Sequence, residues 1–108
     1  MFATPHLVSG CIIEDHEVVS MATKGSRMSV DSLAFHAEAM LDDFNALSKR
    51  INIGVLRNIV VVAEDGGWVL TSNGEEPARV ATALLAASPM TDFADARAKN
   101  AVAAGVAR

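Results

Sequence analysis

The sequence is poor in cysteine and in aromatic residues, with one cysteine, one tryptophan, four phenylalanines and no tyrosine in 108 residues. The lone Cys11 excludes an intramolecular disulfide, and its position in the apolar run 11–13 favours a small buried side chain over a reactive thiol. No segment approaches the roughly 20 consecutive apolar residues of a membrane-spanning helix. The N-terminus also lacks a basic region followed by a long apolar stretch. These absences predict a cytoplasmic protein.

Positive charge is also scarce. Nine basic residues face thirteen acidic ones, the formal net charge is -4, and no basic cluster is larger than the pair Lys49 and Arg50. Because binding to the phosphate backbone depends on clustered cations, nucleic acid is not an expected partner. Anionic membrane surfaces are disfavoured as partners for the same reason.

Signatures of catalysis are missing as well. Asp15, His16 and Glu17 form the only place where histidine and carboxylates crowd together, and a solvated turn explains them best. The sequence has no Cys-x-x-Cys or His-x-x-x-His pair, no nucleophile elbow and no phosphate loop. We therefore predict no catalytic residue, no cofactor and no metal. An enzyme would need a buried polar cleft that joins His16 or His36 to carboxylates.

The sequence is rich in aliphatic residues. Hydrophobic residues make up 51% of the chain, slightly more than a monomer of this size needs for its core, which raises the expectation of a subunit interface. The length suits one domain over residues 1–108.

Two β-hairpins are predicted. Residues 7–13 and 17–22 are mostly apolar and flank a polar break, which is typical of a hairpin. Residues 56–63 include four consecutive β-branched residues, which predicts a strand covered on both faces. Residues 64–67 then supply a turn in which Gly66 and Gly67 provide positive φ, and residues 68–71 return antiparallel.

A long amphipathic helix lies between the hairpins. Ser29 is a typical N-cap, and Asp31 in the first turn interacts favourably with unpaired amides. Apolar residues then recur at three- and four-residue steps for about five turns, which predicts one face that packs on the sheet: Val30, Leu33, Ala34, Ala37, Met40, Leu41, Phe44 and Leu47. Phe35 and Ala39 stand together on a flank of this face and form a candidate second contact surface.

The last third of the chain is less clear. For residues 78–87 the alanine and leucine content favours a helix, whereas the position after two antiparallel strands favours a third strand. A final helix is predicted over residues 92–104 and ends at Gly105. Its apolar members are Phe93, Ala96, Val102 and Val106.

This order of elements resembles the roadblock family, which is named for a dynein light chain and includes bacterial and archaeal regulators of Ras-like GTPases. Residues 11–22 resemble the family's first hairpin, and residues 29–70 resemble its central helix, glycine-containing connection and second hairpin. The resemblance implies an α+β, profilin-like fold with a five-stranded antiparallel sheet, residues 78–85 as the fifth strand, and a C-terminal helix. The family's first helix is expected to be absent, because few residues precede Leu7 and Pro5 disfavours a helix there.

The resemblance also implies a function. Family members pair through the central helix and an edge strand, so a homodimer is expected that regulates or scaffolds a small Ras-like GTPase without catalysis. Phe35, Ala39 and Asp42 are candidate contacts on the helix. Trp68 is interpreted as a core residue first and a partner-binding anchor second. The alternative function is a small-molecule sensory domain, since such folds can hold a ligand between sheet and helix.

Overall fold

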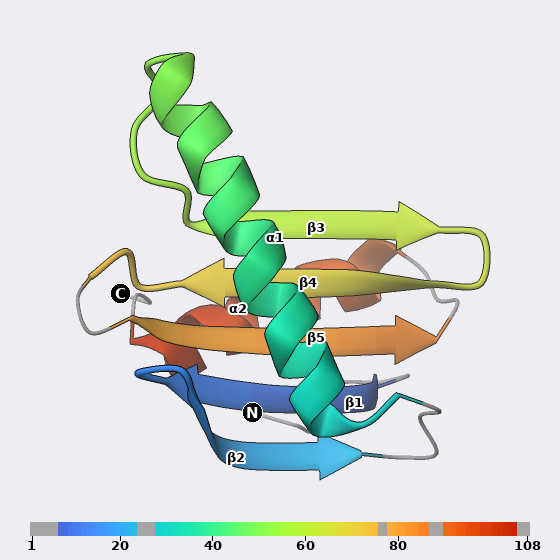
Figure 1. Cartoon of the computed structure of the whole chain (residues 1–108). Helices are drawn as coiled ribbons and strands as arrows, with labels where there is room; N and C mark the ends of the chain where they lie inside the picture. Colours follow the sequence, from blue (N-terminus) through green and yellow to red (C-terminus); the bar gives the residue numbers. More distant parts are fainter. Residues whose placement is uncertain (1–6, 24–27, 76–77, 87–89, 106–108) are drawn as a thin grey trace.

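The computed structural model describes residues 7–23, 28–75, 78–86 and 90–105, with the side chains of the last segment described from residue 94 onward (Figure 1). Seven elements follow one another along the chain: β1 (Leu7–Glu14), β2 (Glu17–Thr23), α1 (Val30–Arg50), β3 (Asn58–Ala63), β4 (Gly66–Ser72), β5 (Arg79–Ala86) and α2 (Met90–Ala104). The α+β fold predicted from the sequence, with two hairpins around a long helix, is confirmed.

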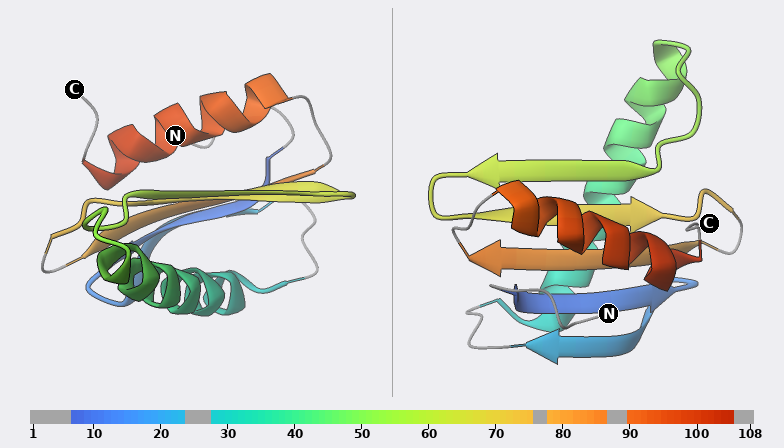
Figure 2. Two further views of the ribbon diagram at one scale, coloured as in Figure 1. Left: turned by 90° about the horizontal axis from the view of Figure 1, so that it is seen from above. Right: turned by 180° about the vertical axis from the view of Figure 1, so that it is seen from behind.

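All five strands form one antiparallel sheet in the order β2-β1-β5-β4-β3. The two helices lie on opposite faces of this sheet, α1 on one and α2 on the other (Figure 2). The chain therefore has three layers, with β2 and β3 at the two edges of the middle layer. The expected absence of a helix before β1 concerns residues 1–6, which lie outside the described residues.

The start of α1 follows its sequence signals. Ser29 is the N-cap, and its hydroxyl accepts a 3.1 Å hydrogen bond from the amide of Ser32. The first turn carries Asp31 and the last turn carries Lys49 and Arg50, as the helix dipole favours. Buried apolar residues of the helix and of the sheet beneath it form one core cluster: Cys11, Ile13, Ala34, Ala37, Leu41, Leu70 and Val80.

The opposite face of the sheet is covered by α2 through small residues and one amide. Ala96, Asn100 and Ala104 are buried on the sheet side of this helix. The side-chain amide of Asn100 donates to the carbonyl oxygens of Val69 at 3.1 Å and Ala81 at 3.4 Å. Of the apolar members named for this helix, Ala96 is buried, whereas the side chain of Val102 is 70% exposed. The side chains of residues 93 and 106 lie outside the described part of the chain.

Residues 79–86 form the central strand β5, which settles the ambiguity of this segment. Both edges of β5 are paired, one with β1 and the other with β4. Val80, Ala81, Ala83 and Leu85 are buried. Tertiary pairing therefore overrides the helical propensity of alanine and leucine, and the fifth strand implied by the family resemblance is confirmed.

Two details of the second hairpin differ from the prediction. The strand β3 is not covered on both faces, because it lies at the sheet edge and most of its side chains are exposed. Glu64 and Asp65 alone form the turn, and Gly66 is the first residue of β4. Among the described glycines, positive φ is found instead at Gly54, Gly74 and Gly105. Gly66 is needed for a close approach, since a Cβ there would lie 2.5 Å from the carbonyl oxygen of Leu85.

Candidate functional site: an open sheet edge and the grooves beside the central helix

The edge strand β3 presents an open and regular backbone. Its six residues, Asn58–Ala63, carry no charged side chain and pair with β4 without a register shift. Val60, Val61 and Val62 are all exposed. An unpaired, uncharged and β-branched edge of this kind is a template for pairing with another strand.

The edge strand β2 differs from β3 both in its regularity and in its charge. The register between β1 and β2 shifts next to Ile12, so that Val19 is an extra residue in β2. The strand also begins with the charged Glu17. Bulges and charges protect sheet edges from unwanted pairing. Of the two edges, β3 is therefore the one suited to accept a partner strand.

The C-terminal turns of α1 extend past β3, beyond the edge of the sheet (Figure 1). Phe44, Leu47 and Ile51 continue the three- and four-residue spacing of the buried Leu33, Ala37 and Leu41. The first three are nevertheless 47%, 47% and 58% exposed. They continue the sheet-facing side of the helix, but none of the described strands covers them fully.

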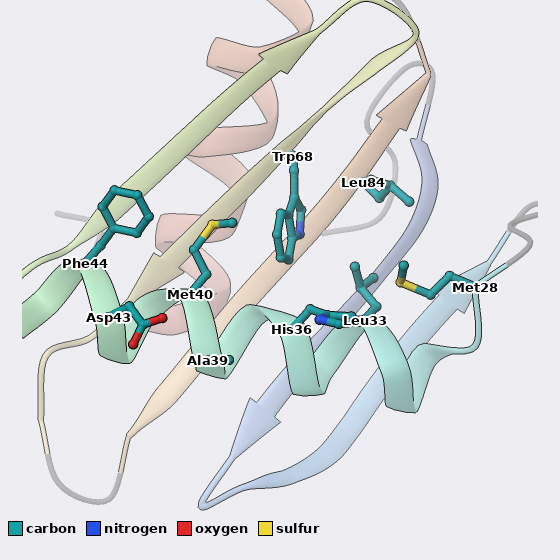
Figure 3. Close-up of a pocket in the computed structure, with 9 residues that line it drawn as sticks. All are labelled: Met28, Leu33, His36, Ala39, Met40, Asp43, Phe44, Trp68 and Leu84. Carbon is teal, nitrogen blue, oxygen red and sulfur yellow. The ribbon is translucent and has the colours of Figure 1, made fainter.

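A groove of about 530 Å³ runs along α1, between the helix and the strands β4 and β5 (Figure 3). We call it the Trp68 groove. Its lining is mostly apolar: Met28, Leu33, His36, Ala39, Met40, Asp43, Phe44, Trp68 and Leu84. A second groove of about 650 Å³ toward the β3–β4 turn shares Met28, Trp68 and Leu84 with it. The two grooves therefore form one continuous depression on the face of the sheet that carries α1.

The four residues predicted as interface contacts are not gathered in one place. Trp68 is half-buried and lines both grooves, and Ala39 lines the Trp68 groove. Phe35 is 69% exposed, with its ring edge-on to that of His36 at 5.6 Å between centroids. Asp42 lies on the other flank of α1. The structure thus divides the predicted contacts between a groove, an exposed residue of α1 and a separate cleft.

Sequence reasoning assigned no interface role to Phe44, Leu47 and Ile51, the exposed apolar residues at the end of α1. The first two share the spacing of true core residues, so the periodic pattern places them in the core. Only the angle at which α1 crosses the sheet determines which of these apolar helix residues are covered by strands and which are exposed. The sequence did carry an indication of the exposed edge at Val60 to Val62. A strand that is rich in valine and has no charged residue is expected either at the centre of a sheet or at an edge that pairs with another chain.

The cleft that contains Asp42 has a volume of about 340 Å³. We call it the Glu75 cleft. It lies between the second half of α1, the β1–β2 turn, and the loops before β3 and β5. At its border, Nδ1 of His16 lies 2.6 Å from Oε2 of Glu38. This contact raises the pKa of His16 above its ordinary value, through the hydrogen bond and the charge of Glu38.

The pairing of His16 with Glu38 does not provide the buried polar cleft that a catalytic role requires. The side chain of His16 is 81% exposed, and both Asp15 and His16 have the positive φ of a tight turn. Among the described residues, no group of three or more histidine, cysteine or acidic side chains could hold a metal ion. Cys11 is fully buried, and burial together with the charges of Asp31 and Glu38 raises its pKa to about 11.

The fold has counterparts among solved structures, although no protein-family model and no curated protein matches the chain. A Roadblock/LC7 domain from Streptomyces avermitilis superposes with a TM-score of 0.73 at 16% identity, covering 95% of this chain and 83% of that one. The gliding protein MglB from Thermus thermophilus gives a TM-score of 0.76 at 16% identity, with 94% and 78% covered. An MglB with a tetrameric arrangement gives the same TM-score and identity, with 94% and 77% covered.

Neither helix of the described residues is long and apolar enough to cross a membrane. The five-stranded antiparallel sheet with its two helices superposes on these structures over 94–95% of the chain. The chain therefore has the fold of the roadblock family.

Proposed function

We propose that the chain forms a homodimer through β3 and α1, and that this dimer regulates or scaffolds a small Ras-like GTPase, or a similar switch protein, without catalysing a reaction itself. The observation that carries the proposal is the coincidence of an open β3 edge with an exposed apolar overhang of α1 directly above it. Both features are expected to be covered by a partner at the same edge of the sheet.

A second copy of the chain satisfies both features at once. If β3 pairs with β3 of the second copy, the sheet continues across the two chains and its unpaired backbone groups are bonded. The overhanging Leu47 and Ile51 of each copy then lie over the sheet of the other copy. Helix α1 of the second copy enters the depression formed by the two grooves, where Trp68 becomes an anchor for it.

Self-association is also found on this fold, since one of the similar structures is a tetrameric arrangement of MglB. The regulatory role rests on the roadblock resemblance, because that family includes regulators of Ras-like GTPases. In the dimer, the outward part of α1 around Phe35 stays free for such a partner. An exposed aromatic side chain is a frequent centre of protein interfaces.

We expect regulation by positioning of the GTPase's own residues, without an inserted arginine from this chain. Arg79 is already committed, since its Nε donates to the carbonyl oxygen of Ala103 at 2.8 Å and its guanidinium bonds to Glu14. Arg50 and Arg57 show no feature that selects them for catalysis. The role of such an arginine would be to stabilise the charge of phosphoryl transfer.

The dimer is tested by Leu47→Asp, which places a charge in the overhang. Because Leu47 is half exposed in the single chain, the substitution leaves the monomer fold intact and disrupts association. The matched control is Val102→Asp, which introduces the same charge at an exposed position of α2, on the other face of the sheet. If light scattering gives half the mass of the unmodified protein for Leu47→Asp and the full mass for Val102→Asp, the interface is supported. Equal masses for the two variants would contradict it.

The GTPase role is tested with purified Ras-like GTPases from the same organism, each loaded with GDP or with a slowly hydrolysed GTP analogue. We expect one of them to bind the dimer in one nucleotide state and to lose binding with Phe35→Ala. Parallel assays measure GTP hydrolysis and nucleotide release. If no such GTPase binds or changes its rates, the regulatory role is wrong.

The volume of the Trp68 groove favours a second candidate function, a small-molecule sensory domain. About 530 Å³ lies within the range of small-molecule pockets, and the lining is mostly apolar with a few polar groups, among them His36 and Asp43. Native mass spectrometry of the purified protein tests this alternative. A ligand of constant mass that leaves after Trp68→Ala would favour it over the dimer.

A further inference from the structure

The Glu75 cleft lies on the opposite flank of α1 from the Trp68 groove. It does not share a lining residue with the Trp68 groove. Its lining combines an apolar floor, formed by the buried Leu41 and Val80, with charged groups around the mouth. The proposed role of this cleft is therefore separate from that of the Trp68 groove.

The charges around the mouth are mainly negative. Carboxylates of Glu38, Asp42 and Glu75 line the cleft, together with the ammonium group of Lys49 and the imidazole of His16. Glu38 is engaged by His16. Within the described part of the chain, by contrast, no ion pair or hydrogen bond engages the carboxylate of Asp42 or of Glu75. Two exposed carboxylates thus remain unpaired beside an apolar floor.

The walls of the cleft are joined by hydrogen bonds that backbone amides donate. The amide of Leu56 donates to Oδ1 of Asn45 at 2.9 Å, which fixes the loop before β3 against α1. The amide of Asp15 donates to the carbonyl oxygen of Ala78 at 3.1 Å, which joins the β1–β2 turn to the loop before β5. A cleft with fixed walls loses little conformational entropy when it is filled.

We propose that the Glu75 cleft binds one arginine or lysine side chain presented by a partner protein. The aliphatic stem of such a side chain lies along Leu41 and Val80, and its cationic head reaches the carboxylates of Asp42 and Glu75. Arginine is favoured, because its guanidinium can donate to two carboxylates in a fixed geometry. The volume of about 340 Å³ suits one long side chain and its flanking backbone. The net charge of -4 favours the approach of a basic partner.

The test uses NMR spectra of the ¹⁵N-labelled protein with a capped tripeptide, acetyl-Ala-Arg-Ala-amide. We expect saturable shifts confined to residues around Leu41, Asp42 and Glu75. The matched ligand replaces arginine with citrulline, which has nearly the same shape without the charge, and it should bind about tenfold more weakly. Free arginine is the third ligand, since it carries the same side chain without a peptide backbone.

The protein variants are Asp42→Asn and Glu75→Gln, each of which removes one exposed negative charge. Their control is Glu64→Gln in the β3–β4 turn, at the opposite end of the sheet. We expect the first two variants to weaken tripeptide binding about tenfold and the control to leave it unchanged. Equal binding of the arginine and citrulline peptides, shifts elsewhere or no shifts would overturn the proposal. Stronger binding of free arginine than of the tripeptide would also overturn it, in favour of a small-molecule site.

The mass of the unmodified protein in solution is a separate readout. If the protein is a dimer that does not bind the tripeptide, the proposed arginine site is wrong and the proposed homodimer stands. If the protein is a monomer that binds the tripeptide, the proposed homodimer is wrong and the arginine site stands.

Discussion

The indole Nε1 of Trp68 donates a 2.6 Å hydrogen bond to the hydroxyl oxygen of Thr82 on the neighbouring strand. Thr82 is fully buried, while Trp68 is half-buried at the junction of the two grooves. The bond therefore fixes one edge of the indole to β5 and leaves the rest of the ring facing the groove (Figure 3). The only tryptophan of the chain is thus held in a defined orientation at the surface where we place the second copy.

Thr82→Val removes this acceptor and keeps nearly the same side-chain shape. We expect the free energy of unfolding to fall by about 1 kcal/mol, because the indole N–H loses a partly buried partner. Urea unfolding followed by far-UV circular dichroism measures the change, and tryptophan fluorescence reports the altered surroundings of the ring. The control is Thr23→Val at an exposed position of β2. Equal stability of the two variants would show that the bond contributes nothing.

Gly66→Ala tests the close approach of β4 to β5. The added methyl group would meet the carbonyl oxygen of Leu85 at 2.5 Å, and this backbone atom moves only if the strand pairing shifts. We expect a loss of about 1–3 kcal/mol in the free energy of unfolding, as for other overpacked sites. Asp65→Ala, at the adjacent exposed turn position, should change stability far less. An unchanged midpoint of unfolding for Gly66→Ala would mean that the strands do not approach each other this closely.

The contact between His16 and Glu38 makes stability depend on pH. The carboxylate of Glu38 raises the pKa of His16 above its ordinary value of 6.5. A group whose pKa is higher in the folded state stabilises the fold when protonated. The stabilisation is therefore complete below the ordinary value and is lost as the pH rises through the raised pKa of the folded protein.

Glu38→Gln isolates this effect. We expect NMR titration to give a lower pKa for His16 in the variant than in the unmodified protein. Unfolding by urea should show a larger stability difference between the two proteins at about pH 5.5 than at about pH 8.5. An unchanged His16 pKa, or the same difference at both pH values, would show that the two side chains do not interact in solution.

Local pattern was enough to predict the hairpins and the central helix. The polar break at residues 14–16 and the Ser29 cap both mark element ends within one or two residues of those observed. By contrast, β5 was not decided by its own residues, since alanine and leucine favour a helix. Its pairing with β1 and β4 across long sequence separations fixes it as a strand, which only the family resemblance indicated beforehand.

The candidate site was less accessible from sequence, because it depends on where elements end relative to one another. Leu41 and Leu47 have the same spacing in the pattern, yet one is buried and the other overhangs the sheet. Asn100 shows a related difficulty on the other face. A buried amide that bonds to strand carbonyls cannot be distinguished by periodicity from a polar surface residue.

The absolute mass of the protein in solution, measured by light scattering over a range of concentrations, tests the proposed homodimer most directly. The open β3 edge and the overhang of α1 predict a stable mass of about twice the 11.3 kDa of one chain. A mass of 11.3 kDa at every concentration would contradict the dimer, and with it the shared sheet on which the proposed function rests.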